Sequence, residues 1–160
     1  KDHPDLVLKV TSVWWTTGDA TRRKLVKHAL RTQVKAGNPL ALSILGYGGQ
    51  RAIHVSSLSC TPHLVSIGGN VQIEILLSNP TAGEAAGLID LRIHFVKSKG
   101  SRNAKVFKGK EVVLAPNNTT SFKRTISVAQ QTTRTRYPGE HLVEVMINGQ
   151  VTKSMVFRVF

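Results

Sequence analysis

The sequence has one cysteine, Cys60, among 160 residues. One cysteine cannot form a disulfide within the chain, which suits a reducing compartment, and we expect a cytoplasmic protein. Long apolar runs are also missing, since no stretch approaches the roughly 20 residues that cross a bilayer, so the sequence does not support membrane association. No glycine-rich phosphate loop leads from a strand into a helix, and nucleotide hydrolysis is therefore not expected.

Carboxylates are scarce, because 9 Asp and Glu stand against 22 Lys and Arg. They are scattered and offer no evident acid–base pair for catalysis. Asp2, Asp5 and Asp19 stand where helices are predicted to begin, and that position explains them. Cys60 and His63 have a metal-like separation but cannot complete a tetrahedral site. We therefore expect no metal and no cofactor.

The basic excess is spread along the chain. Residues 1–50 contain 8 basic and 3 acidic side chains, and residues 51–160 contain 14 and 6. An excess that persists through both parts attracts a polyanion, with nucleic acid as the first candidate. The alternative is a basic surface that serves solubility alone.

The hydrophobic periodicity changes near residue 50. Apolar residues recur at helical spacing before Gly48 and alternate with a period of two after Ala52. The change predicts two domains: residues 1–48, the C-terminal end of a helical solenoid, and residues 49–160, a β-sandwich.

Helix-start signals divide the first domain into three predicted helices. Pro4 opens the first helix, Asp19 caps a second over residues 20–36, and Asn38 caps a third over residues 40–45. The first helix carries an apolar stripe of Leu6, Val7, Val10, Val13 and Trp14, and the second is predicted to bury Leu25, Val26, Ala29, Leu30 and Val34.

Antiparallel helices joined by short turns are the unit of an α-solenoid, in which each unit buries its apolar face against a neighbour. About 48 residues are too few to close a core, so we expect the chain to be the C-terminal part of a larger protein. Trp14 and Trp15 are adjacent and point to different sides of their helix, so at most one lies in a core. The other is expected at a rim, a repeat interface or a ligand surface.

Alternating runs with turn residues every 8 to 12 positions follow the helical domain. Residues 71–78 and 89–96 are clear examples, and Asn148-Gly149 predicts a type I′ hairpin leading into residues 151–159. Seven or eight short strands of this kind favour an immunoglobulin-like antiparallel sandwich.

Basic residues gather in three places suited to phosphates. Residues 97–110 hold six Lys and Arg and are predicted to form a loop between two strands, while residues 130–136 combine hydroxyl, amide and guanidinium donors. A third basic cluster is a ridge along the second predicted helix, formed by Arg23, Lys27 and Arg31 at positions i, i+4 and i+8. The candidate DNA-binding residues are Arg22, Arg23, Lys27, Arg31 and Lys35 on the helix, and Lys97, Lys99, Arg102, Lys105, Lys108, Lys110, Arg134 and Arg136 in the sandwich.

Each basic cluster also has an ordinary structural explanation. Residues 97–110 fit a solvated hairpin end, residues 130–136 fit an edge strand kept polar, and the helical ridge fits a solvated face. Asp90, Arg92 and His94 alternate on their strand, which is typical of a solvated sheet face rather than a catalytic site.

Several stretches resemble a known family. Residues 22–32 (RRKLVKHALRT), 35–42 and 45–47 resemble the last HEAT-like repeat of bacterial DNA alkylation repair glycosylases of the AlkC/AlkD superfamily. Residues 88–97, 105–110 and 132–141 resemble the immunoglobulin-like C-terminal domain of its AlkC branch.

The resemblance implies a terminal HEAT-like repeat joined to an immunoglobulin-like sandwich. It also implies a parent enzyme that removes cationic bases, such as 3-methyladenine and 3-methylcytosine, by hydrolysing the N-glycosidic bond without flipping the base into a pocket. Family catalysis relies on carboxylates and aromatics of earlier repeats, so no residue here is assigned as catalytic. The expected partners are double-stranded DNA with alkylated bases and the N-terminal repeats of the same protein. The alternative is a non-enzymatic immunoglobulin-like module that binds protein.

Overall fold

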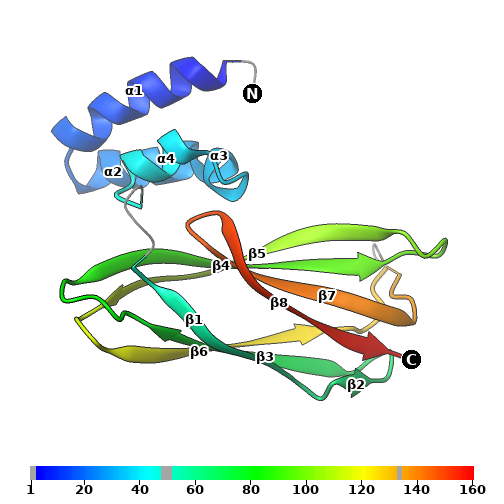
Figure 1. Ribbon diagram of the computed structural model, residues 1–160. Coiled ribbons are helices and arrows are strands. Elements are labelled where there is room, and N and C mark those ends of the chain that lie inside the picture. The colour runs from blue at the N-terminus through cyan, green and yellow to red at the C-terminus, as the bar shows by residue number, and fades with distance from the viewer. Residues whose placement is uncertain (1–2, 48–51, 133–134) are drawn as a thin grey trace. The chain divides into compact units, whose positions relative to one another are not determined.

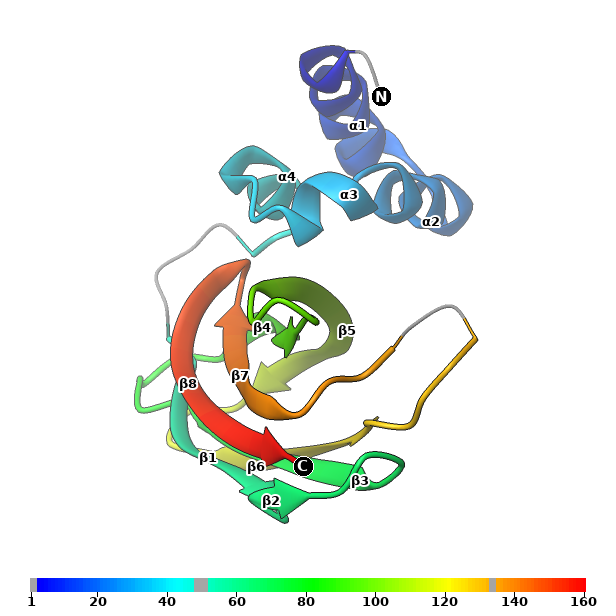
Figure 2. The same ribbon diagram turned by 90° about the vertical axis from the view of Figure 1, so that its right-hand side faces the viewer.

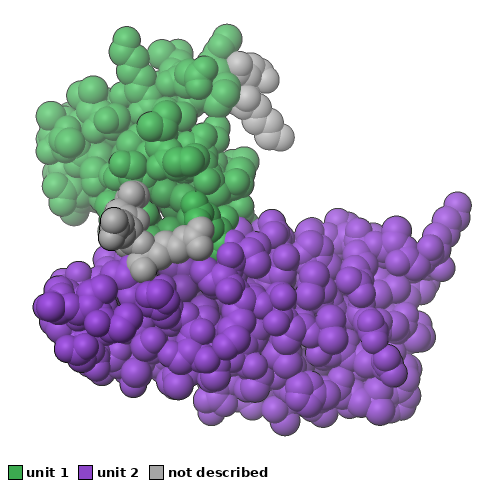
Figure 3. Space-filling view, viewed as in Figure 1, with its two compact units in different colours: residues 1–51, 148–150 green, residues 52–147, 151–160 purple. Residues whose placement is uncertain are grey.

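The computed structural model describes residues 3–47, 52–132 and 135–160 (Figure 1). The chain divides into two compact units, one of residues 1–51 with 148–150 and the other of residues 52–147 with 151–160 (Figure 3). The predicted boundary between residues 48 and 49 lies outside the described residues and stays a prediction.

The helical unit contains four helices: α1 (Pro4–Thr17), α2 (Ala20–Ala29), α3 (Arg31–Lys35) and α4 (Pro39–Ile44). The predicted caps are confirmed. Asp19 Oδ1 accepts a hydrogen bond from the Arg22 N–H at 2.8 Å, and the Asn38 side chain accepts from the first N–H groups of α4. No helix in the described part of the chain is long and apolar enough to span a membrane.

The prediction of a single helix over residues 20–36 is wrong in one respect: the structure has two helices there, α2 and α3, with Leu30 between them. Leu30 has φ −81° and ψ −4°, in the turn-like part of the right-handed region. Its N–H still donates to the Val26 carbonyl at 2.9 Å, and its carbonyl accepts from the Val34 N–H at 2.8 Å. Hydrogen bonds of the α type therefore connect α2 to α3 across the interruption.

The apolar stripe of α1 does not lie in a core. Trp14 is 44% exposed, and Leu8 and Thr11 are the buried residues of this helix. In the second predicted helix Val26, Leu30 and Val34 are buried as predicted, whereas Leu25 and Ala29 are exposed. Most of these exposed residues line one apolar groove of about 480 Å³, which no other described helix covers: Leu6, Val7, Val10 and Trp14 of α1, and Leu25 and Ala29 of α2. The periodicity correctly found an apolar face, but the neighbour that would bury it is not among the described residues.

The second unit is a sandwich of two sheets (Figures 1 and 2). The smaller sheet has the order β1 (His54–Thr61), β3 (Asn70–Ser78), β6 (Thr119–Ser127). The larger has the order β2 (Leu64–Val65), β8 (Gln150–Val159), β7 (Gly139–Ile147), β4 (Ala85–Val96), β5 (Arg102–Leu114). The described pairs are antiparallel except for β2 with β8, which is parallel.

The core lies between the two sheets and follows the predicted alternation. Val71, Ile73, Ile75 and Leu77 of β3 are fully buried, so the predicted inward face of this strand is confirmed. The predicted hairpin is also confirmed, because Asn148 and Gly149 have φ values of 50° and 74°, as a type I′ turn requires.

The predicted loop over residues 97–110 is mostly strand. β5 begins at Arg102, so only residues 97–101 connect it to β4. The first half of β5 lacks an apolar alternation because it is an edge strand, with polar side chains on both faces. This difference decides where the basic side chains point.

Candidate nucleic-acid interface

Two lysines of β5 lie on the core side of the large sheet. Lys105 is paired with Ile93 and Lys110 with Ile89, and both isoleucines are fully buried in the core. Directly paired residues of antiparallel strands project from the same face of a sheet. The two lysines therefore emerge at the open edge of the sandwich, beside its core.

Two further cations of β5 lie on the outer side. Arg102 is paired with Val96 and Lys108 with Asp90, and these positions alternate with the core residues of β4. Both cations are exposed. The basic cluster predicted as one loop is thus divided by the strand between two faces.

A bulge sets this division. Ile89 is paired with Lys110 and Asp90 with Lys108, so Gly109 is the extra residue. The Asp90 Oδ1 atom accepts a hydrogen bond from the Gly109 N–H at 2.9 Å. Asp90 is only 4% exposed, which corrects the prediction that it faces solvent: at the bulge its carboxylate bonds backbone that the ladder leaves open.

Aromatic rings and cations meet beside this edge. The rings of Phe95 and Phe107 contact edge to face, with centroids 6.4 Å apart. Lys105 Nζ lies 4.7 Å and the Arg124 guanidinium 5.4 Å from the Phe107 centroid, and the Arg136 guanidinium lies 3.9 Å from the Phe95 centroid. Ring faces attract cations, so the aromatic pair holds three positive groups near one another.

Arg124 also joins the two sheets. It stands on β6, and its Nη1 atom donates to the Lys108 carbonyl of β5 at 2.6 Å. A strand at a sheet edge has open backbone acceptors, and this bond satisfies one of them.

A cavity of about 620 Å³ opens where the β4–β5 turn meets the segment that precedes β7. Its lining residues come from these two stretches and are Phe95, Val96, Lys97, Ser98, Asn103, Ala104, Lys105, Thr135, Arg136 and Tyr137. Of the predicted site residues, the cavity brings together Lys97, Lys105 and Arg136. Lys99, Arg102, Lys108 and Lys110 do not line it.

The described residues of the segment 130–136, namely 130–132 and 135–136, form no continuous strand, and Gln131 makes only an isolated bridge. The Gln130 side chain accepts from the Arg136 N–H at 2.8 Å and donates to the Arg136 carbonyl at 2.9 Å, which closes a loop. Arg136 is 8% exposed, so the prediction that it stands on an open polar surface is corrected. Arg134 lies outside the described residues.

His141 contacts a lining residue from each side of the cavity, Val96 and Tyr137. It is fully buried, its Nδ1 accepts from the Val96 N–H at 3.3 Å, and its Nε2 lies 3.1 Å from the Tyr137 carbonyl. An N–H can only donate and a carbonyl only accept, so the ring carries its proton on Nε2. Burial lowers the pKa of His141, the nearby Arg136 lowers it further, and the bond to Tyr137 opposes the shift in part.

The β4–β5 turn leaves its lysines in solvent. The Lys97 N–H donates to the Ser101 carbonyl at 2.8 Å, and the Gly100 N–H donates to the Lys97 carbonyl at 2.9 Å. Gly100 has φ 74°, which glycine adopts at little cost. Lys97 and Lys99 are exposed at this tip.

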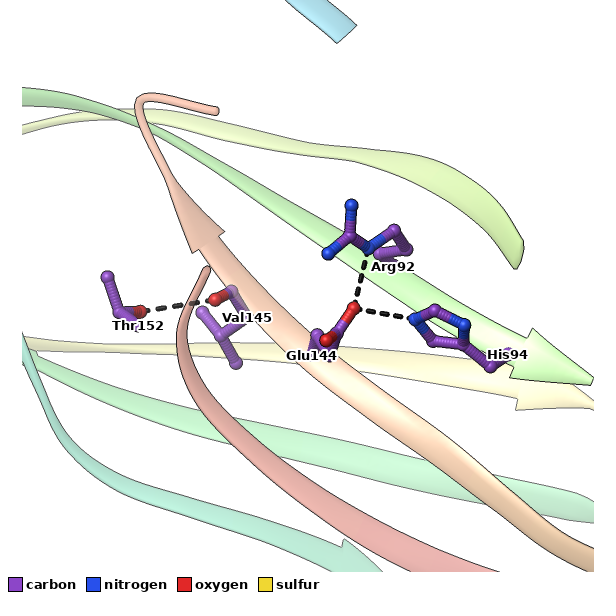
Figure 4. Close-up of polar contacts among 5 residues, drawn as sticks. All are labelled: Arg92, His94, Glu144, Val145 and Thr152. Atoms are coloured by element: carbon purple, nitrogen blue, oxygen red, sulfur yellow. Dashed lines mark hydrogen bonds and ion pairs between the residues drawn. The ribbon is translucent and has the colours of Figure 1, made fainter. Parts of the chain in front are cut away.

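The outer face of the large sheet carries a separate polar group (Figure 4). Glu144 Oε2 lies 2.5 Å from Arg92 Nε and 2.6 Å from His94 Nε2. Burial opposes ionisation of Glu144, but the hydrogen bonds from Arg92 and His94 prevail and lower its pKa. Because Arg92 is engaged by Glu144, we interpret this group as structural.

The helical unit presents its own basic surface. The Arg23 guanidinium lies 5.7 Å from the Trp15 ring centroid, and both residues line a shallow cavity of about 560 Å³ with Lys24 and Lys27. Arg22 follows the Asp19 cap on α2, while Arg31 and Lys35 stand on α3. Trp15 is half-buried beneath this surface, and Lys24 is an addition to the predicted residues.

Sequence reasoning missed several lining residues of the 620 Å³ cavity. Asn103 and Thr135 stand in the two stretches predicted to suit phosphates but were not singled out, Tyr137 stands in neither stretch, and only the fold brings the three together. Phe95 gave a usable signal, because the alternation of its strand predicts that it points inward.

Comparison with known proteins shows the family. Residues 54–160 match the family described as "Uncharacterised protein YhaZ, C-terminal Ig-like domain". The protein described as "Uncharacterized protein YhaZ", from Bacillus subtilis (strain 168), is 36% identical over 159 residues, which are 99% of this chain and 44% of that protein.

Solved structures agree with this match. A Pseudomonas fluorescens alkylpurine DNA glycosylase, AlkC, bound to DNA containing an abasic site analog, has a TM-score of 0.89 and 30% identity over 99% of this chain and 44% of its own. A β-glucosidase from Listeria innocua in complex with isofagomine has a TM-score of 0.53 and 16% identity over 67% of this chain and 16% of its own, which shows the sandwich fold alone. The chain spans less than half the length of YhaZ and of AlkC. By its matched sandwich, the chain belongs to the family of the YhaZ C-terminal immunoglobulin-like domain, and it is similar in sequence and structure to AlkC.

Proposed function

We propose that the chain is the DNA-binding C-terminal part of a DNA alkylation repair glycosylase. Its parent protein removes cationic alkylated bases, of the 3-methyladenine and 3-methylcytosine type, by hydrolysing the N-glycosidic bond. The observation that carries this proposal is the similarity, over 99% of the chain, to a glycosylase solved in complex with DNA. Basic side chains in both units support it, since phosphates dominate the affinity of proteins for DNA.

In this proposal the chain clamps duplex DNA with two sets of cations. The helical set is Arg22, Arg23, Lys27, Arg31 and Lys35, and the sandwich set is Lys97, Lys99, Arg102, Lys105, Lys108, Lys110 and Arg134, the last of which lies outside the described residues. Arg136 belongs to the cavity rather than to the open surface. Such contacts position DNA but do not read its sequence.

The helical unit is, in this proposal, the last HEAT-like repeat of a longer solenoid. The relatives are more than twice as long as this chain, and the groove of α1 and α2 is almost entirely apolar. We propose that earlier repeats cover Leu6, Val10 and Trp14 and supply the catalytic groups. The chain alone is then expected to bind DNA and excise nothing. We also propose a cytoplasmic location for the protein.

A salt titration of DNA binding tests the proposal. Fluorescence anisotropy with a short duplex would compare the chain with the triple variant Lys99→Gln, Arg102→Gln, Lys108→Gln, whose three residues are exposed and outside the cavity. If six to ten phosphates are contacted, affinity should fall by roughly 10³ to 10⁵ between 50 and 200 mM salt. The triple variant should bind more weakly and show a shallower salt slope.

The matched control is the triple variant Lys123→Gln, Lys153→Gln, Arg158→Gln, which loses the same charge on β6 and β8. It should bind nearly as the unmodified chain does. Equal losses in both variants would point to non-specific attraction. No binding at low salt by a folded chain would favour the protein-interaction module instead.

A further inference from the structure

The 620 Å³ cavity of the sandwich has an unusual charge balance. Its cations are Lys97, Lys105 and Arg136. None of its lining residues, which all belong to the described part of the chain, is Asp or Glu. Three positive groups around one hollow raise its electrostatic potential, so an anion is the ligand that the cavity attracts.

The neutral lining groups suit the same ligand. Ser98, Asn103, Thr135 and Tyr137 are lining residues that carry hydroxyl or amide groups, which are able to donate hydrogen bonds. Phosphate oxygens accept several hydrogen bonds at once, and they bind most strongly to donors that carry charge. A tetrahedral phosphate therefore satisfies more of this lining than a carboxylate does.

The aromatic floor does not offer a stacking platform. Phe95 is 6% exposed, the Arg136 guanidinium covers its ring at 3.9 Å, and Phe107 and His141 contact it edge to face. A base needs an open ring face on which to stack. Recognition in this cavity consequently falls to the phosphate rather than to the base.

The cavity is larger than a single phosphate group needs. Its volume of about 620 Å³ lies within the range of roughly 300 to 1,000 Å³ that holds small organic ligands. A phosphate with its attached sugar fits such a space, with the base directed toward solvent.

The walls are fixed without a ligand. His141 connects Val96 to Tyr137, and the Gln130 amide holds both backbone groups of Arg136. A site built in advance loses less conformational entropy when the ligand binds.

We propose that this cavity binds one nucleotide unit of a DNA strand through its phosphate, irrespective of the base. This inference rests on the proposed function, because DNA is the source of the phosphate. It assigns to Lys97, Lys105 and Arg136 a phosphate site in the cavity, which differs from the surface of Lys99, Arg102 and Lys108 outside the cavity.

The test is a two-dimensional ¹⁵N NMR titration of the 160-residue chain with dAMP, dTMP, their nucleosides and inorganic phosphate. Both nucleotides should shift the amides of the cavity lining with similar affinity, and the nucleosides should shift none. The double variant Lys97→Gln, Lys105→Gln should weaken nucleotide binding roughly tenfold or more, because it loses charge-assisted hydrogen bonds. Lys123→Gln, on the exposed β6 surface, should leave the affinity unchanged. A short duplex should displace the nucleotides.

Other results overturn the inference. Nucleosides that bind as well as nucleotides would show that the base is read. Full affinity in the double variant would remove the lysines from the site, and failure of the duplex to compete would indicate a site for free nucleotides. Salt-sensitive duplex binding without a nucleotide site in the cavity would overturn this inference and leave the proposed function standing. A different result would support the cavity site and contradict the surface clamp. In that result the duplex displaces the nucleotides, and the surface triple variant binds the duplex as tightly as the unmodified chain does.

Discussion

The carboxylate of Asp90 on β4 holds the backbone N–H of Gly109 on β5, at 2.9 Å, where the ladder between these strands slips by one residue. A Cβ atom at Gly109 would lie 1.9 Å from the Ile89 carbonyl oxygen, so no larger residue fits there unless the strands separate. The bond and the glycine together fix the register of the edge strand.

Gly109→Ala should therefore destabilise the sandwich by about 1–3 kcal/mol, the usual cost of forcing extra atoms into packed structure. The change is measured as the free energy of unfolding in urea. Gly83→Ala is the matched control, because a Cβ atom there meets nothing within 4 Å. Equal stability of the two variants would contradict the role given to the bulge.

Some elements of the fold are predictable from the sequence, and others are not. The alternation of β3 identified its core residues because both neighbours of this strand lie in the same sheet and one face meets the core. The caps at Asp19 and Asn38 were also predictable, because a side-chain oxygen before a helix has a local effect. Leu30 was not, since a leucine is a good helix former and nothing in its neighbours indicates an interruption.

The candidate site was predictable only in part. Charge alone identifies the basic residues of 97–110, but it predicts a loop for them because β5 lacks alternation at its start. Pairing with β4 assigns Lys105 and Lys108 to opposite faces, and register is a long-range property that local composition does not contain. The cavity needs Tyr137 and Asn103 together, from stretches that are far apart in the sequence.

Acidification should weaken the sandwich through His141. Burial first, and then Arg136, hold its folded pKa below the ordinary 6.5, so the unfolded chain binds more protons as the pH falls through that value. Stability should be constant above about pH 7.5 and should decline below pH 6.5 until the folded pKa is passed, by at most about 1.4 kcal/mol per pH unit.

Urea unfolding between about pH 7.5 and 5.5 measures this decline, in a range above the titration of Glu144. His141→Gln should be less stable at neutral pH, because the ring also stacks on Phe157 with centroids 5.3 Å apart. Its stability should nevertheless decline less over the same range. An unchanged slope in the variant would assign the pH dependence to other groups.

Cys60 should resist thiol reagents in the folded chain. Its side chain is fully buried in the sandwich core, and burial raises its pKa to about 11. The thiolate is the reactive species, so both access and ionisation are suppressed. An aromatic disulfide reagent at about pH 8 should react at once in denaturant and slowly in buffer. Rapid reaction of the folded chain would show that the core opens readily.

Arg124→Gln should loosen the edge of the sandwich. The variant loses the bond to the Lys108 carbonyl and the contact with the Phe107 ring, at a cost of about 0.5–1.5 kcal/mol for an exposed hydrogen bond. Hydrogen exchange of the β5 amides should rise most in the variant. Lys123→Gln removes only an exposed ion pair with Glu74 on neighbouring strands, and it should change stability by less than about 0.5 kcal/mol. Similar effects of the two changes would argue against a bridge between sheets.

The extra residue Gly109 also changes the alternation of side-chain directions along β5. In an unbroken strand, residues five positions apart point in opposite directions. Lys105 and Lys110 nevertheless lie on the same side, because the unpaired Gly109 between them shifts the alternation by one residue. If Gly109 were instead paired as an ordinary ladder residue, Lys110 would lie on the other side of the sheet, although no charge in the chain would change. The direction of the field around this edge is therefore encoded in strand register as much as in composition.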